Sequence, residues 1–136
     1  REIEAAAAFV HADSFIESLP GGYHAKVIER GASYSSGERQ LISFARTILR
    51  DPKVLILDEA TANIDTETEL LIQESMRKMR EGRTTIAIAH RLSTIRDAHL
   101  ILVLDKGRVI ERGTHEELIA KRGTYYDMYM LQSMND

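Results

Sequence analysis

The sequence contains no cysteine and no tryptophan, and only two of its 136 residues are proline. Without cysteine the chain has no disulfide framework, no thiol nucleophile and no zinc–thiolate site. Its longest apolar runs, 5–10 and 100–104, are far shorter than the ~20 residues that a membrane-spanning helix needs. The first 30 residues also lack the basic, apolar and small-residue order of a secretory signal peptide. We therefore expect a soluble, intracellular chain.

A strong charge of one sign is also missing. The chain has 18 Lys and Arg residues against 21 Asp and Glu residues, and a net charge of −3. No basic stripe stands out, so we expect no nucleic-acid partner. The hydrophobic content of 43% argues against intrinsic disorder. A chain of this length forms one domain or a large piece of one.

Hydrophobic periodicity predicts alternating helices and strands. The predicted helices cover 3–19, 37–50, 67–80, 116–121 and 125–134; the predicted strands cover 54–57 and 85–89, followed by a hairpin of 100–104 with 108–111. The short apolar runs at 54–57 and 85–89 are typical of strands buried on both faces of a parallel sheet. The strand–helix–strand order predicts an α/β fold.

Polar side chains follow the two predicted sheet strands. Asp58 and Glu59 come directly after the first strand, and His90 follows the second. Ligand sites in parallel α/β sheets lie at the carboxyl ends of the strands. There Asp58 suits a water-bridged Mg²⁺ ion and Glu59 suits proton abstraction from water. The alternatives are a solvated acidic turn and a structural histidine.

A second polar segment, Tyr34–Glu38, opens the predicted helix at 37–50. Small residues at a helix start expose backbone N–H groups at the positive end of the helix dipole, which favours an anion. The alternative is an ordinary serine N-cap.

In combination, these segments resemble the second half of the nucleotide-binding domain of ATP-binding cassette (ABC) transporters. Residues 34–40 resemble the signature motif, usually L-S-G-G-Q, and 55–59 resemble the Walker B strand. Residues 62–65 resemble the D-loop, and 89–91 the switch-histidine loop. Asp58 lies 21 residues after Gly37, and His90 lies 31 residues after Glu59, as the family order requires. Segments 19–31 and 107–118 are similar to those of ABC exporters.

The resemblance implies a fold and a division of the chain. The fold is a partial P-loop NTPase core of the RecA-like, three-layer type, with the remaining part of the ABC helical subdomain. Residues 1–52 correspond to the helical subdomain with the signature motif. Residues 53–136 correspond to Walker B, the D-loop, the switch-histidine loop and the C-terminal helices.

The resemblance also implies a role for each motif residue. Glu59 orients or deprotonates the attacking water, Asp58 holds the Mg²⁺ shell, and His90 senses the γ-phosphate. Asp65 reaches across a dimer interface. In the signature, the Ser35 hydroxyl and the Gly37 amide cap the γ-phosphate. Ser36 and Glu38, their neighbours in the motif, belong to the same nucleotide-binding segment.

The implied cofactors are ATP and Mg²⁺, and the implied activity is ATP hydrolysis that drives transmembrane export. The implied partners are a second nucleotide-binding domain, in a homodimer or a heterodimer, and the coupling helices of a transmembrane domain. The implied location is the cytoplasmic face of the plasma membrane.

Two departures from the family pattern matter. No segment matches the P-loop pattern G-x-x-x-x-G-K-[ST], so the chain is expected to begin partway through the domain, to bind ATP weakly and to hydrolyse none alone. Uncovered apolar surface and self-association are expected for the same reason.

In the signature, Tyr34, Ser36 and Glu38 replace the usual Leu, Gly and Gln. That change resembles the degenerate site of heterodimeric multidrug exporters; a homodimer with a tolerated variant is the alternative.

Two further functions compete with the exporter ATPase. One is a non-catalytic module for dimerisation or regulation, and the other is a soluble ABC ATPase that does not transport. Four other histidines lack metal-ligand spacing and are expected to be structural or exposed: His11, His24, His99 and His115.

Overall fold

The computed structural model describes residues 1–28, 31–58 and 64–135. The chain divides into two compact units, Arg1–Ile86 and Ala87–Asp136. The first unit contains α1 (Glu2–Phe9), α2 (Asp13–Ser18), the short 3₁₀ helix η1 (Gly22–His24), α3 (Ser36–Leu49), β1 (Val54–Asp58) and α4 (Thr66–Arg80). β2 (Thr84–Ile88) begins in this unit and ends in the next. The second unit contains η3 (Leu92–Ile95), β3 (Ile101–Asp105), β4 (Arg108–Gly113), α5 (His115–Lys121) and α6 (Thr124–Ser133).

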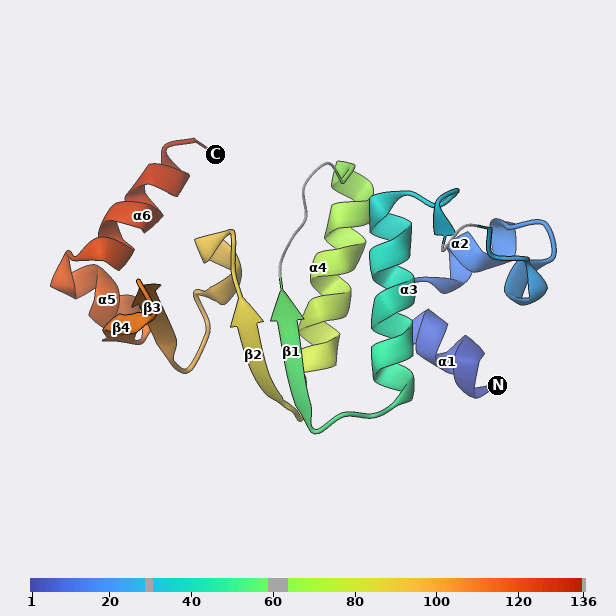
Figure 1. Ribbon diagram of the computed structural model, residues 1–136, viewed down its shortest axis with the longest axis horizontal. Helices are drawn as coiled ribbons and strands as arrows, with labels where there is room; N and C mark the ends of the chain where they lie inside the picture. The colour runs from blue at the N-terminus through green and yellow to red at the C-terminus, as the bar shows by residue number, and fades with distance from the viewer. Residues whose placement is uncertain (29–30, 59–63, 136) are drawn as a thin grey trace. The chain divides into compact units, whose positions relative to one another are not determined.

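The core of the first unit lies between α1, α3, α4 and one face of β1. Figure 1 shows α3 and α4 side by side next to β1. The apolar stripe of α3 contributes Leu41 and Phe44, and β1 contributes Leu55 and Leu57. The remaining buried members come from α1, α4 and the turn after α1: Ala7, Val10, Ala12, Ile72, Met76 and Met79. The mixed α/β class and the predicted helix at 37–50 are confirmed.

The predicted single helix at 3–19 is wrong, because the chain turns at His11. His11 takes a left-handed φ of 58°, and the Ala12 N–H bonds back to the Ala7 carbonyl at 2.8 Å. Contacts from α4 compensate for this break. The buried Ser75 hydroxyl donates to the Val10 carbonyl at 2.8 Å, and Lys78 Nζ lies 3.1 Å from His11 Nε2. Tertiary hydrogen bonds therefore override a helix-favouring, alanine-rich sequence.

The prediction that both sheet strands are buried on two faces is also wrong. In β1, Leu55 and Leu57 are buried, but Val54 is 56% and Ile56 68% exposed. In β2, Ile86 and Ile88 are both more than half exposed. The physical reason is that the buried cluster lies on one face of β1. The expected uncovered apolar surface is therefore present on these strands.

An arginine fixes the start of the β1–β2 sheet. The two strands are neighbours, and their arrows run in the same direction in Figure 1. Arg83 pairs with Asp51 at 2.9 Å and donates to the Pro52 carbonyl at 3.0 Å. The Thr84 N–H donates to the Lys53 carbonyl at 3.0 Å. The turn before β2 is thus tied to the loop before β1.

The second unit is built on the predicted hairpin. β3 and β4 pair antiparallel, with Asp105 opposite Arg108 and an irregularity between Val103 and Leu104. Lys106 and Gly107 connect them, both with left-handed φ values (47° and 76°), as a type I′ turn requires. The buried cluster of this unit consists of Leu92, Ile101, Val103, Leu118 and Tyr125. No helix in the described ranges is long and apolar enough to cross a bilayer.

A glutamate from the hairpin caps α6. The Glu111 carboxylate accepts the Tyr125 N–H at 2.8 Å, at the start of the helix, where unpaired N–H groups favour an anion. Gly123 is the N-cap residue, and a Cβ there would collide with Glu111 Oε1. A side chain at 123 would therefore displace the Glu111 carboxylate from the start of α6.

We expect Gly123→Ala to destabilise the chain by roughly 1–2 kcal/mol, the cost of losing a helix cap. Thermal or urea unfolding followed by circular dichroism measures this loss. In an E111A background, the same G123A change should cost much less, since the colliding carboxylate is gone. An equal cost in both backgrounds would contradict this explanation.

Candidate functional site

The segment 34–38 forms the N-terminus of α3 through a reciprocal capping box. Ser35 Oγ accepts the Glu38 N–H at 3.1 Å, and Glu38 Oε2 accepts the Ser35 N–H at 2.7 Å. The serine N-cap interpretation is therefore confirmed. Ser36, the first residue of α3, is exposed. The Glu38 carboxylate already occupies the positive end of the helix, where an anionic ligand would also bind.

Tyr34 is anchored to α2. Its ring meets the Phe15 ring edge to face, with centroids 5.3 Å apart. The Tyr34 N–H donates to the Gly31 carbonyl at 3.0 Å, and Gly31 has a left-handed φ of 82°. Tyr34 also lines an open pocket of about 670 Å³ together with Phe15, Leu19, Ile28 and Glu38, among others. The aromatic replacement in the signature thus packs against the preceding helix.

Gly37 is buried against the start of α4. A Cβ at Gly37 would collide with the Thr68 side-chain methyl and lie 3.3 Å from the Ile64 methyl Cγ2. The backbone of Gly37 is helical, so its lack of a side chain serves close packing between α3 and α4.

Asp65 is the N-cap residue of α4. Its Oδ2 accepts the Thr68 N–H at 2.9 Å. Hydrogen bonds from the Thr68 backbone N–H and from its side-chain hydroxyl hold the pKa of the exposed Asp65 carboxyl below its ordinary value. The role of Asp65 across a dimer interface stays a prediction.

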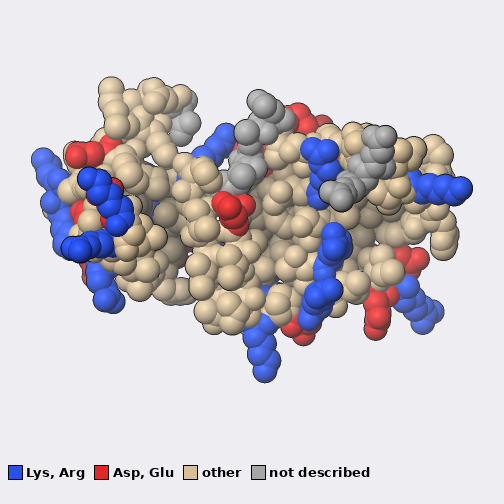
Figure 2. Space-filling model, in the orientation of Figure 1, with Lys and Arg blue, Asp and Glu red and all other residues tan. Residues whose placement is uncertain are grey.

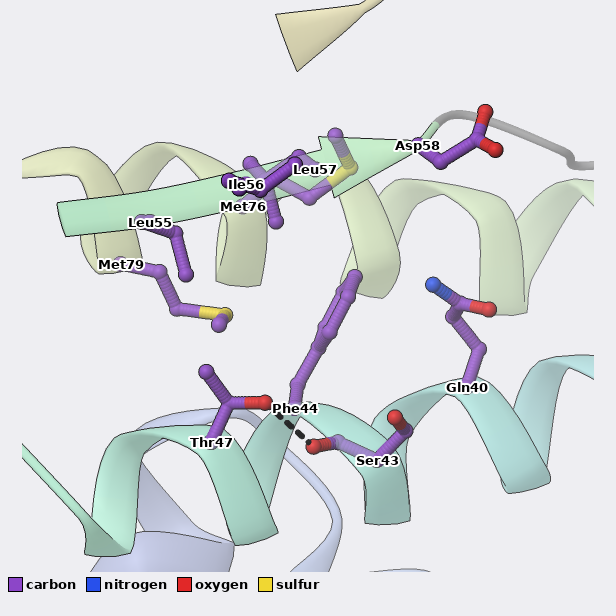
Figure 3. A pocket seen from close by; sticks show the side chains of 10 residues that line it. All are labelled: Gln40, Ser43, Phe44, Thr47, Leu55, Ile56, Leu57, Asp58, Met76 and Met79. Carbon is purple, nitrogen blue, oxygen red and sulfur yellow. Dashed lines mark hydrogen bonds between the residues drawn. The ribbon is translucent and has the colours of Figure 1, made fainter. Parts of the chain in front are cut away.

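Asp58 is the last residue of β1 and is exposed. It lies at one end of a pocket of about 190 Å³ between α3, β1 and α4. Figure 3 shows Leu55 and Met79 at one end of this pocket and Asp58 and Gln40 at the other. Glu59, together with residues 60–63, lies outside the described residues.

The backbone around His90 is held by a residue that the sequence analysis missed. Gln132 of α6 donates from Nε2 to the His90 carbonyl at 2.9 Å and accepts the Leu92 N–H at Oε1, at 2.8 Å. Gln132 is separated from His90 by 42 positions, and no local pattern signals the contact. His90 belongs to the second unit and Asp58 to the first, so their predicted proximity stays a prediction.

Two other histidines have structural roles, as expected. The buried His115 contacts the Tyr125 hydroxyl at 2.8 Å through Nδ1 and packs edge to face on Tyr129. His11 lies 3.4 Å from Glu74 and next to Lys78. Among the described residues, no group of three or more His, Asp or Glu side chains could hold a metal ion.

The surface charges around the site are mixed. Figure 2 shows Lys and Arg side chains of the first unit standing singly, with Asp and Glu between them, on the visible face. At the α3 start itself, the Glu38 carboxylate accepts the Ser35 N–H.

Comparison with known proteins identifies the family. A family model described as "ABC transporter" matches residues 3–62. A Streptococcus pneumoniae protein named as an ABC transporter ATP-binding protein is 68% identical over 97% of this chain and 23% of its own length. The fatty acid ABC transporter ATP-binding/permease protein of Mycobacterium bovis is 56% identical over 93% of this chain and 20% of its own length.

A solved structure gives the same result. A bacterial Atm1-family ABC exporter with ATP bound matches with a TM-score of 0.84 and 47% identity, over 96% of this chain and 23% of that one. The chain thus spans about a quarter or less of the length of these relatives. It belongs to the ABC transporter family, as a segment of an exporter-type nucleotide-binding domain.

The Asp65 cap makes the stability of α4 depend on pH. Because the folded-state pKa is lowered, the stabilisation is complete above the ordinary Asp pKa of about 4 and is lost as the pH falls through the lowered value. Between about pH 6 and about pH 3, we expect the melting temperature of the wild-type chain to fall further than that of D65N, since asparagine caps without titrating. Identical pH dependence in the two proteins would refute the cap.

Proposed function

We propose that this segment serves ATP binding and hydrolysis in an ABC exporter, and that the start of α3 caps an ATP molecule bound mainly by a second nucleotide-binding domain. The observation that supports this most is the presentation of the signature segment at a helix N-terminus, in a chain closely similar to an exporter with ATP bound. Backbone N–H groups there, including that of Gly37, suit the γ-phosphate. In the capping box Ser35 Oγ acts as an acceptor, and its own hydroxyl proton is the group proposed to reach a phosphate oxygen.

Asp58 is proposed to hold Mg²⁺. Magnesium is usually bound through one or two carboxylates plus waters and phosphate oxygens. The exposed Asp58 carboxylate at the end of β1 fits that demand. When bound, the ion neutralises phosphate charge.

Glu59 and His90 are proposed to complete the hydrolytic machinery. Glu59 follows Asp58 directly and accepts a proton from the attacking water, or orients that water. His90 donates to the γ-phosphate. The two hydrogen bonds from Gln132, to the His90 carbonyl and the Leu92 N–H, hold the backbone from which the imidazole extends. Asp65 is proposed to reach the second nucleotide-binding domain.

The proposal also includes a partner domain and a cellular location for this segment. The pocket beside Phe15 and Tyr34 is bordered by Ile28, and Val27 and Ile28 are each more than 60% exposed. These apolar groups suit the coupling helices of a transmembrane domain. Residues 1–52 then act as the helical subdomain and 53–136 as part of the ATPase core, at the cytoplasmic face of the plasma membrane.

The altered signature is proposed to cap a degenerate site in a heterodimer. Glu38 places a carboxylate at the helix end that must receive a phosphate, and like charges repel. Ser36 adds a side chain where the usual signature has glycine. The intact Glu59 then serves the second site, which the partner's signature completes.

Replacing the proposed base tests the activity. In the full-length protein, Glu59→Gln should lower the ATP turnover number by roughly 10²–10⁴-fold while ATP binding persists. A steady-state phosphate-release assay and a nucleotide-binding assay measure the two quantities. Turnover that survives the substitution would exclude Glu59 as the base.

Restoring the usual signature tests the degenerate site. The double change S36G and E38Q should raise turnover severalfold, because it removes the repelling carboxylate and the extra side chain. The matched control is Glu67→Gln, which removes one charge from the first turn of α4 instead. Unchanged turnover in the double variant would favour the homodimer with a tolerated signature.

A further inference from the structure

The signature segment and the start of α4 are joined by one side chain, Thr68. Its backbone N–H donates to Asp65 Oδ2 at 2.9 Å. Its methyl group lies where a Cβ of Gly37 would be. The backbone of Thr68 is thus tied to Asp65, and its methyl group faces Gly37.

A Cβ at Gly37 could be accommodated only if the Thr68 side chain moved. Gly37 has helical backbone angles, and glycine in a helix is less favourable than alanine by up to ~1 kcal/mol. Its presence therefore reflects the approach of α4. Close-packed contacts of this kind transmit a displacement of one element to the other.

We propose that Thr68 is a positioning residue that sets the place of the signature segment from the start of α4. The inference rests on the proposed function, under which the start of α4 follows the hydrolytic residues of one ATP site and the signature caps the other. The contacts Asp65–Thr68–Gly37 then link the two ATP sites within one chain. A shift of the α4 start moves the Gly37 amide relative to the phosphate that it caps.

The test uses the full-length protein and separates the two halves of the Thr68 side chain. G37A should lower kcat by roughly 10²-fold, the cost of a misplacement of about 1 Å, with little change in KM for ATP. T68S keeps the hydroxyl and removes the methyl, so G37A/T68S should regain most of the lost kcat. T68V keeps a methyl in that place, so G37A/T68V should stay as slow as G37A.

Thermal unfolding of every variant distinguishes displacement from loss of fold. If G37A does not fold, T68L tests the same contact from the α4 side: its longer side chain should lower kcat with little change in KM, in a protein that still unfolds cooperatively on heating. The inference is overturned if G37A/T68S is as slow as G37A, if G37A keeps the wild-type kcat, or if T68L does. If the wild-type protein and E59Q hydrolyse ATP equally, the proposed function fails instead.

Discussion

The contact between the first turns of α3 and α4 is the constraint on which the rest of the site depends. Gly37 has no side chain, so the two helices meet where the Thr68 methyl would otherwise collide with a Cβ. Asp65 holds Thr68, and the Ser35–Glu38 capping box holds the α3 start. Three short-range interactions thus place one helix N-terminus, and an N-terminus presents N–H groups only in the direction that its helix is aimed.

The capping box explains why the altered signature segment still forms the N-terminus of α3. Glutamate is a favoured partner of serine in this box, so Glu38 suits the helix while opposing an incoming phosphate. The fold and the ligand make opposite demands on this position. Tyr34 also replaces a usual signature residue, and the fold accommodates it because its ring packs against the Phe15 ring.

The features that could be predicted from the sequence are those that depend on residues near one another in the chain. Periodicity predicted α3 and α4 to within a few residues, and the predicted hairpin of 100–104 with 108–111 is present as β3 and β4. It did not predict the break at His11, since bonds from Ser75 and Lys78 come from a distant helix. The Gln132 hydrogen bond to the His90 carbonyl and the Thr68 contact were missed for the same reason: each joins residues that no local pattern connects.

A structure of the full-length protein with ATP and Mg²⁺, in the E59Q background, tests the central claim most directly. We predict that Ser35 Oγ and the Gly37 amide nitrogen lie ~2.7–3.2 Å from γ-phosphate oxygens of an ATP whose other phosphate contacts come from the second nucleotide-binding domain. An α3 N-terminus that faces solvent or protein, with the nucleotide bound elsewhere, would contradict it.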